Sequence, residues 1–124
     1  MIFAYLDGDD VGTALELMLL DGHTEEARSY SLSVSRALEA ARAILERHSG
    51  LDVIIAGGDD LVAAWRGEII DFALIEEVRN HFVQACGKTM SAGIGFTASE
   101  ATGNLRRAKL MGKNKVVAPT VIES

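Results

Sequence analysis

Cysteine and proline are nearly absent from this chain, which has one of each among its 124 residues. The lone cysteine, Cys86, cannot form a disulfide within the chain, so a small disulfide-stapled secreted fold is excluded. Its place on a helical apolar face favours core packing over a role as nucleophile. With so little proline and 48% apolar residues, sustained disorder is excluded as well. We expect one compact domain over residues 1–124.

Long hydrophobic runs are also missing. The longest, such as IIDFALI at residues 69–75, are interrupted by acids and stay far below the roughly 20 residues that a membrane span requires. The N-terminus has no basic region ahead of its short apolar segment, so it does not resemble a secretory signal. We therefore expect a cytoplasmic protein with no membrane partner.

Positive charge is in short supply. The chain has 12 lysines and arginines against 18 acids, a formal net charge of −6. This balance argues against salt-driven binding along a nucleic-acid backbone, and we expect no DNA partner. A partner that carries phosphate should therefore arrive together with a divalent cation.

The apolar pattern predicts alternating strands and helices. We expect strands at residues 2–6, 51–56, 61–65, 89–96 and 115–118, and helices at 13–48, 71–85 and 99–111, the first interrupted near 21–22 and capped again by Thr24. The order β-α-β-β-α-β, followed by a helix and a short edge strand, is that of an α+β, ferredoxin-like (RRM-like) antiparallel sheet.

Two acidic turns should meet in this fold. DGDD follows the first strand and supplies Asp7, Asp9 and Asp10, whereas GGDD joins the second and third strands and supplies Asp59 and Asp60. With a right-handed crossover the first two strands are parallel, and the third inserts between them. Both turns then lie at the same edge of the sheet, so we expect five carboxylates to gather there.

Such a cluster predicts a cation site. Gathered carboxylates raise one another's pKa unless a cation neutralises them, and oxygen ligands without histidine or cysteine favour Mg²⁺ or Mn²⁺. Two such ions could serve phosphoryl or nucleotidyl transfer. Asp7 and Asp59 are the natural bridging ligands and Asp60 would complete one shell, while Gly57 and Gly58 would let the backbone approach a phosphate.

The two acidic turns also have other interpretations. Taken alone, GGDD fits an ordinary hairpin turn and DGDD a loop that caps the next helix. An EF-hand starting at Asp7 fails, because its fifth position is Val11 and its twelfth is Met18, where a bidentate acid is needed. A phosphoacceptor receiver domain requires a parallel sheet, which the hairpin contradicts.

Basic residues gather near the C-terminal end of the chain. Arg106, Lys109 and Lys113 have the spacing of one helical face, apart from the apolar stripe of the same helix. Such a face could hold the β and γ phosphates of a nucleotide. The alternative is a solvated face whose cations are favoured by the helix dipole.

Four motifs in this order resemble a known group of enzymes. They are LDGDDVG (6–12), AGGDDLV (56–62), SAGIGF (91–96) and AKLMGKNKV (108–116). Together they resemble the Palm-type nucleotide cyclases and polymerases, which include GGDEF diguanylate cyclases, the Palm domain of type III CRISPR effectors and, most closely, the minimal CRISPR polymerase (mCpol) domain. The resemblance covers nearly the whole chain.

The resemblance implies a role for each matching residue. Asp7 and Asp59 would bind two Mg²⁺ or Mn²⁺ ions, with the carbonyl of Gly8 as an added ligand and Asp60 as the second hairpin acid; all three acids would be catalytic. Backbone N–H groups of Asp10, Val11 and Gly12 would cradle the triphosphate of the substrate, and Lys109 with Lys113 would neutralise its charge.

Two departures from the GGDEF pattern bear on the base. GGDEF cyclases have an asparagine that reads guanine eight residues after the first aspartate, where this chain has Leu15. They have glutamate where this chain has Asp60. Both differences favour ATP over GTP.

The function implied is that of a nucleotidyltransferase that joins nucleoside triphosphates, preferably ATP, into a cyclic di- or oligonucleotide messenger with release of pyrophosphate. Because each Palm has one triphosphate cradle, we expect a homodimer. The resemblance also implies antiviral defence, with a separate effector protein that senses the product. A mononucleotide cyclase and a degenerate, nucleotide-binding Palm remain alternatives.

Overall fold

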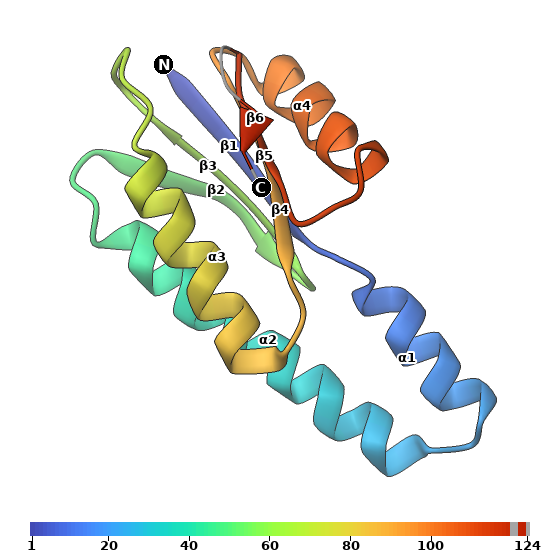
Figure 1. Cartoon of the computed structure of the whole chain (residues 1–124). Helices are drawn as coiled ribbons and strands as arrows, with labels where there is room; N and C mark the ends of the chain where they lie inside the picture. Colours follow the sequence, from blue (N-terminus) through green and yellow to red (C-terminus); the bar gives the residue numbers. More distant parts are fainter. Residues whose placement is uncertain (120–121, 124) are drawn as a thin grey trace.

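A six-stranded sheet with the order β2-β3-β1-β4-β5-β6 forms the centre of the protein (Figure 1). The computed structural model describes residues 1–119 and the backbone of residues 122–123. The strands are β1 (Ile2–Gly8), β2 (Leu51–Gly57), β3 (Asp60–Trp65), β4 (Met90–Gly95), β5 (Val116–Val117) and β6 (Ile122–Glu123), and the helices are α1 (Val11–Leu20), α2 (Thr24–Glu46), α3 (Phe72–Cys86) and α4 (Ala98–Leu110).

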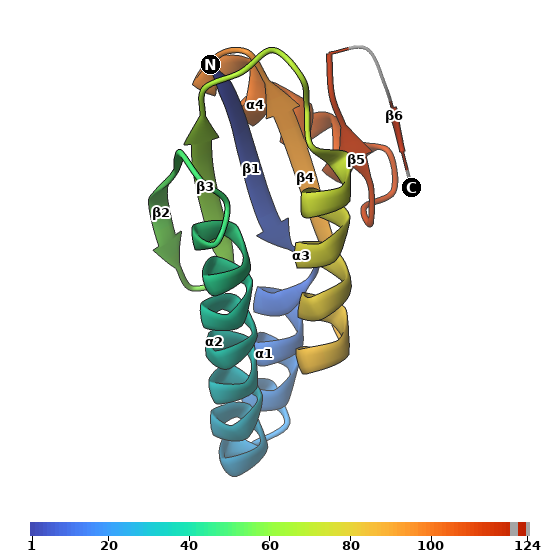
Figure 2. The same cartoon turned by 90° about the vertical axis from the view of Figure 1, so that its left-hand side faces the viewer.

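Helices cover both faces of the sheet. Figure 2 shows α2 and α3 on one face and α4 on the other, while α1 extends beyond the end of the sheet beside α2. The strand β1 has alternating burial, and its buried residues Ile2, Ala4 and Leu6 join apolar residues of α2 and α3 in one core. The intervening residues of β1, with Asp7 among them, face the side on which α4 lies. No helix of the described chain is long and apolar enough to cross a membrane.

The helix α4 packs very closely on β4. A Cβ atom at Gly93 would lie 2.1 Å from the backbone nitrogen of Leu105 and 2.2 Å from the carbonyl of Ala101. Only glycine permits this approach of helix to strand. The contact fixes α4 over the sheet, and α4 in turn carries Lys109 toward the end of β1.

The predicted ferredoxin-like α+β fold is confirmed, with three corrections. β5 is not an edge strand, because it pairs in parallel with β4 and in antiparallel with β6. Thr24 does not cap α2; His23 is the N-cap, and Thr24 is the first helical residue. α1 begins at Val11, two residues earlier than expected. The single-domain prediction for residues 1–124 stays a prediction, and residues 120, 121 and 124 lie outside the described chain.

Candidate active site

The two acidic turns meet because β1 and β3 pair in antiparallel register. Asp7 of β1 lies directly opposite Asp60 of β3, and the backbone N–H of Gly8 donates a hydrogen bond to the carbonyl of Asp59 over 3.1 Å. A Cβ atom at Gly8 would lie 2.9 Å from Val11 Cγ2 and 3.1 Å from Asp59 Oδ2, so a side chain there would push the turns apart. The expected juxtaposition of the turns is confirmed.

The hairpin turn exposes its backbone. Gly57 pairs with Asp60, which leaves Gly58 and Asp59 as the turn. Gly58 has a φ of 60°, a left-handed conformation that glycine adopts without steric strain. Both glycines are exposed, so a ligand can approach the backbone here, as the sequence predicts.

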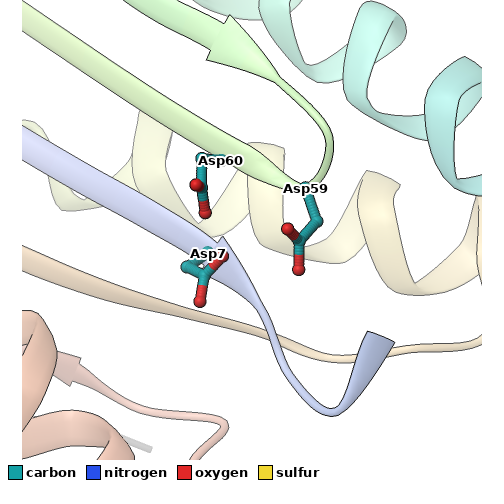
Figure 3. A group of neighbouring side chains, drawn as sticks. All are labelled: Asp7, Asp59 and Asp60. Carbon is teal, nitrogen blue, oxygen red and sulfur yellow. The ribbon is translucent and has the colours of Figure 1, made fainter. Parts of the chain in front are cut away.

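Three of the acids form one group. Figure 3 shows Asp7, Asp59 and Asp60 gathered where β1 ends and the hairpin turns, and one carboxylate oxygen of each lies within 4.8 Å of the others. A hydrogen bond with Asp7, burial, and the charges of Asp7 and Asp59 raise the pKa of Asp60 from 3.8 to about 7. Burial, followed by the charge of Asp7, also raises the pKa of Asp59. A cation among these groups would relieve their mutual repulsion.

The chemistry of this group fits a hard divalent cation. Its ligand atoms are carboxylate oxygens from three partly buried side chains, with no histidine or cysteine among them. Mg²⁺ and Mn²⁺ prefer such oxygens, whereas zinc prefers nitrogen and sulfur. Among the described residues, no other group of acids, histidines and cysteines is close enough to hold an ion.

Asp9 does not belong to the acidic group, which corrects the expectation of five gathered carboxylates. Its side chain is only 3% exposed, and its two oxygens accept four hydrogen bonds, from Thr89 Oγ1, Ser91 Oγ, Lys109 Nζ and the backbone N–H of Asn114, at 2.7–3.0 Å. Burial alone would raise the pKa of Asp9, but the bonds from Lys109, Thr89 and Ser91 outweigh it and lower that pKa. These bonds use nearly all the lone pairs of the carboxylate and leave little room for a metal.

Lys109 reaches into the site from α4. Its Nζ lies 3.1 Å from Asp7 Oδ2 and 2.7 Å from Asp9 Oδ1, and 3.3 Å and 3.0 Å from the carbonyls of Asp7 and Gly8. Burial would lower the pKa of Lys109, but the bonds to Asp9 and Asp7 outweigh it, so the pKa is raised. The ammonium thus contacts both the carboxylate of Asp7 and the Gly8 carbonyl that the resemblance assigns to a metal.

The start of α1 lies beside the acidic group. Asp10 has a φ of 60°, and Ala14 N–H is bonded to the Asp10 carbonyl, so the N–H groups of Val11, Gly12 and Thr13 have no intrahelical acceptor. Such a helix N-terminus favours anions. The carboxylate of Asp10 does not cap these N–H groups but forms an ion pair with Lys113.

Lys113 is close to the site, but not on the helical face that its spacing suggests. The helix α4 ends at Leu110, and Lys113 and Asn114 follow it in left-handed conformations, with φ of 65° and 50°. The predicted common basic face of Arg106, Lys109 and Lys113 is therefore wrong. Arg106 is exposed on α4, whereas both lysines turn toward the acids of the β1–α1 loop.

A cleft of about 200 Å³ opens between the hairpin turn and helices α1 and α2. The following residues line it: Val11, Gly12, Leu15, Ser31, Val34, Ser35, Gly58 and Asp59. Apolar side chains and two serine hydroxyls thus lie next to a site acid, a mixture that suits a nucleobase. The sequence did not reveal Ser31 and Ser35, because nothing in the α2 pattern distinguishes them from other small residues on that helix.

The sequence also missed the partners of Asp9. Thr89 and Ser91 flank the buried start of β4, and Asn114 lies in the turn after α4. Arg79 of α3, 6% exposed, extends this network, because its guanidinium donates to the Asn114 side chain and to the Met90 carbonyl. In the sequence, the polar residues at the start of β4 and an arginine within the apolar stripe of α3 are the signals that could have indicated this network.

Residues 3–118 match the minimal CRISPR polymerase (mCpol) domain family. No curated protein matches the sequence. Among solved structures, the fold is similar to the Csm1–Csm4 cassette in complex with pppApA, with a TM-score of 0.75 and 23% identity over 93% of this chain and 20% of that chain. The cassette in complex with cA3 gives a TM-score of 0.71 and 26% identity over the same shares.

The fold is also similar to that of a diguanylate cyclase. The diguanylate cyclase SiaD from Pseudomonas aeruginosa, solved with its activator SiaC, gives a TM-score of 0.64 and 21% identity over 94% of this chain and 49% of that chain. The chain thus spans a fifth of the length of the Csm1–Csm4 matches and about half of SiaD. Because the family match runs over nearly the whole chain, this protein belongs to the minimal CRISPR polymerase (mCpol) domain family.

Proposed function

We propose that this protein is a divalent-metal-dependent nucleotidyltransferase that joins nucleoside triphosphates, preferably ATP, into a cyclic di- or oligonucleotide with release of pyrophosphate. The observation that carries the proposal is the convergence of Asp7, Asp59 and Asp60, with ligand oxygens within 4.8 Å of one another. The trio lies beside a helix N-terminus and a loop that two lysines contact, and this arrangement suits a metal-bound triphosphate.

Each part of the site has a role in this reaction. Asp7 and Asp59 would hold two Mg²⁺ or Mn²⁺ ions between them, with Asp60 and the carbonyl of Gly8 as further ligands. When bound, such ions lower the pKa of the attacking hydroxyl and neutralise charge at the α phosphate. The Gly58 backbone, exposed in the turn, would lie against the substrate.

The triphosphate would extend from the acids toward the start of α1. The N–H groups of Val11 and Gly12, which have no intrahelical acceptor, would donate to phosphate oxygens. Lys109 and Lys113 would supply the positive charge, since both ammonium groups already lie at the β1–α1 loop. The hydroxyl of one nucleotide attacks the α phosphorus of another, so that a phosphodiester bond forms and the bond to pyrophosphate breaks.

The proposed preference for ATP over GTP rests on the cleft beside Asp59. Leu15 lines this cleft where GGDEF cyclases have the asparagine that reads guanine. An apolar side chain cannot pair with the polar edge of a base, and guanine has more hydrogen-bonding groups on that edge than adenine, so leaving the edge unpaired in a cleft lowers affinity more for guanine. Complexes of the similar Csm1–Csm4 cassette with pppApA, cA4 and cA3 point in the same direction.

A cyclic di- or oligonucleotide requires a second nucleotide and a second attack. The described part of one chain has one acidic trio and one helix N-terminus beside it, so we propose that two copies face each other, each holding one nucleotide. Family membership extends the proposal to antiviral signalling, in which a separate effector protein senses the product.

Mass spectrometry of the reaction products tests the proposal. The full chain is incubated with each of ATP, GTP, CTP and UTP in the presence of Mn²⁺, and pyrophosphate release is followed in parallel. We expect a cyclic product of two or more adenylates with stoichiometric pyrophosphate. The double variant Asp59→Asn/Asp60→Asn should make none, whereas Asp52→Asn, an exposed acid of β2 elsewhere on the sheet, should retain the activity.

Other products would change the conclusion. A product with the mass of one cyclised nucleotide would identify a mononucleotide cyclase. Calorimetric ATP binding without pyrophosphate release would identify a nucleotide-binding module without turnover. Full turnover by the double variant would refute the site assignment.

A further inference from the structure

Lys109 contacts oxygens that the proposed function assigns to a divalent ion. The Lys109 ammonium contacts the carboxylate of Asp7, the carbonyl of Asp7 and the carbonyl of Gly8 at 3.0–3.3 Å. A metal bound to the same oxygens would lie within a few ångströms of this positive charge. The two cations repel each other and share ligands, so each should weaken the binding of the other.

Asp9 is what keeps the ammonium there. Its bond to Lys109 Nζ, at 2.7 Å, is the shortest that the lysine makes. Asp9 is itself immobilised, because Thr89, Ser91 and the backbone of Asn114 donate to its remaining positions. Arg79, buried in α3, then fixes Asn114 through its side-chain oxygen at 2.9 Å. The lysine is therefore held by a rigid buried network.

We propose that Asp9 is a positioning residue that holds the Lys109 ammonium on the Asp7 and Gly8 oxygens, where it competes with the first divalent ion. The inference rests on the proposed function for the location of the ion, and it adds that Lys109 opposes metal binding until phosphate draws its charge away. Metal alone should thus bind weakly, and metal that arrives with a nucleotide should bind well. The site would select the metal–nucleotide complex over free metal.

Calorimetric titration with Mn²⁺ alone, without nucleotide, tests the competition. The titration is done at pH 8.5, above the raised pKa of Asp60. We expect Lys109→Met to tighten Mn²⁺ binding by roughly tenfold, the size that removing a unit charge near a divalent ion gives under strong solvent screening. Arg107→Met removes the same charge from an exposed position on α4 and should leave Mn²⁺ affinity within about twofold. The proposal would be overturned if Lys109→Met bound Mn²⁺ as weakly as wild type or more weakly, or if neither wild type nor Lys109→Met bound Mn²⁺.

A double-mutant cycle tests the part played by Asp9. Asp9→Asn removes a negative charge, which weakens Mn²⁺ binding, but it also frees Lys109, which strengthens it. In the Lys109→Met background only the first effect remains, so Asp9→Asn should weaken Mn²⁺ binding more there than in the wild-type chain. Additive effects of the two substitutions would show that Asp9 does not act through Lys109. Loss of protein stability alone would not produce the coupling.

A nonhydrolysable ATP analogue separates this inference from the proposed function. If Lys109 also binds phosphate, Lys109→Met should weaken binding of the Mn²⁺–analogue complex although it tightens binding of Mn²⁺ alone. Tighter Mn²⁺ binding with unchanged analogue binding would support the competition and count against the phosphate role. The reverse result would support the phosphate role and overturn the competition.

Discussion

Asp7 and Asp60 lie directly opposite each other on two central, antiparallel strands. Like charges at such a position destabilise a sheet, and neither residue is fully exposed to the water that could screen the repulsion. The sheet nevertheless brings them together and adds Asp59 from the adjoining turn. A local conflict of this kind, held in place by an otherwise consistent fold, is typical of a functional site.

The conflict should be measurable as a pH-dependent loss of stability. The pKa of Asp60 is raised from 3.8 to about 7 in the folded chain, so the folded state holds a proton that the unfolded state loses. Stability contributed by this group is therefore present below about pH 4 and is lost as the pH rises to about 7. We expect Asp60→Asn to unfold like wild type at pH 4 and to be more stable by about 1–2 kcal/mol at pH 8, given solvent screening of the partly open site.

Urea unfolding at several pH values in EDTA checks this prediction. Asp52→Asn, on the exposed part of β2, serves as the control and should show no such trend. Adding Mg²⁺ should stabilise wild type, by about 1.4 kcal/mol at ten times the dissociation constant, and should reduce the advantage of Asp60→Asn. An advantage that is the same at pH 4 and pH 8 would contradict the assigned cause.

The sequence predicted the fold well because its strong signals are local. The run IFAYL, the GGDD turn and the apolar stripe of α2 each specify one element, and the crossover rule then brings the two turns together. What it missed depends on contacts between distant residues. β5 pairs with both β4 and β6, and two-residue strands of this kind leave no periodicity to detect.

The sequence predicted that Asp7, Asp59 and Asp60 lie together, which the structure confirms. The predicted positions of Asp9 and Lys113 were wrong, for a similar reason. Asp7 and Asp9 are two residues apart in the same acidic motif, but Asp7 lies on β1 opposite Asp60, whereas Asp9 follows the end of β1 and enters a buried hydrogen-bond network. Lys113 lies beyond the end of α4 at Leu110 and has a left-handed conformation, so the helical spacing that placed it on one face with Lys109 does not apply to it. The positions of charged residues in the sequence do not distinguish a residue of the acidic group, such as Asp7, from a buried partner of Lys109, such as Asp9.

Gly93→Ala should disturb α4 and with it the position of Lys109. The added Cβ would meet the backbone of Leu105 and Ala101 at 2.1 and 2.2 Å, and backbone cannot rotate away as a side chain can. We expect a loss of roughly 2–4 kcal/mol in unfolding free energy. Gly103→Ala is the matched control on α4, where nothing lies within 4 Å of the new atom, and it should stabilise by about 0.5–1 kcal/mol. Equal effects of the two substitutions would argue against the close packing of α4 on β4.

Leu15→Asn should shift the choice of base toward GTP. The asparagine would add donors and acceptors to the cleft beside Asp59, and one good side-chain pair with a base edge contributes about 1–3 kcal/mol of discrimination. We expect the ratio of kcat/KM for ATP to that for GTP to fall by about tenfold or more. Leu17→Asn, on an exposed part of α1 that does not line the cleft, should leave the ratio unchanged. A fall in activity with both nucleotides and no change in ratio would mean that the base does not lie in this cleft.

Asp9→Asn and Asp10→Asn should differ sharply in their effect on stability, although the residues are neighbours. In Asp9→Asn, the amide of the new side chain would point N–H donors at the hydroxyls of Thr89 and Ser91 and at the Lys109 ammonium. The Asp9 side chain is only 3% exposed, so water cannot replace the lost hydrogen bonds. Breaking such a buried, charge-assisted network costs about 2–4 kcal/mol. Asp10 is half exposed and pairs with Lys113 at the surface, where an ion pair contributes about 0–1 kcal/mol, and asparagine keeps the tolerance for its positive φ. Urea denaturation of both variants at pH 7 measures the difference; a loss of less than about 1 kcal/mol for Asp9→Asn would mean that Asp9 is hydrated and free to bind a metal.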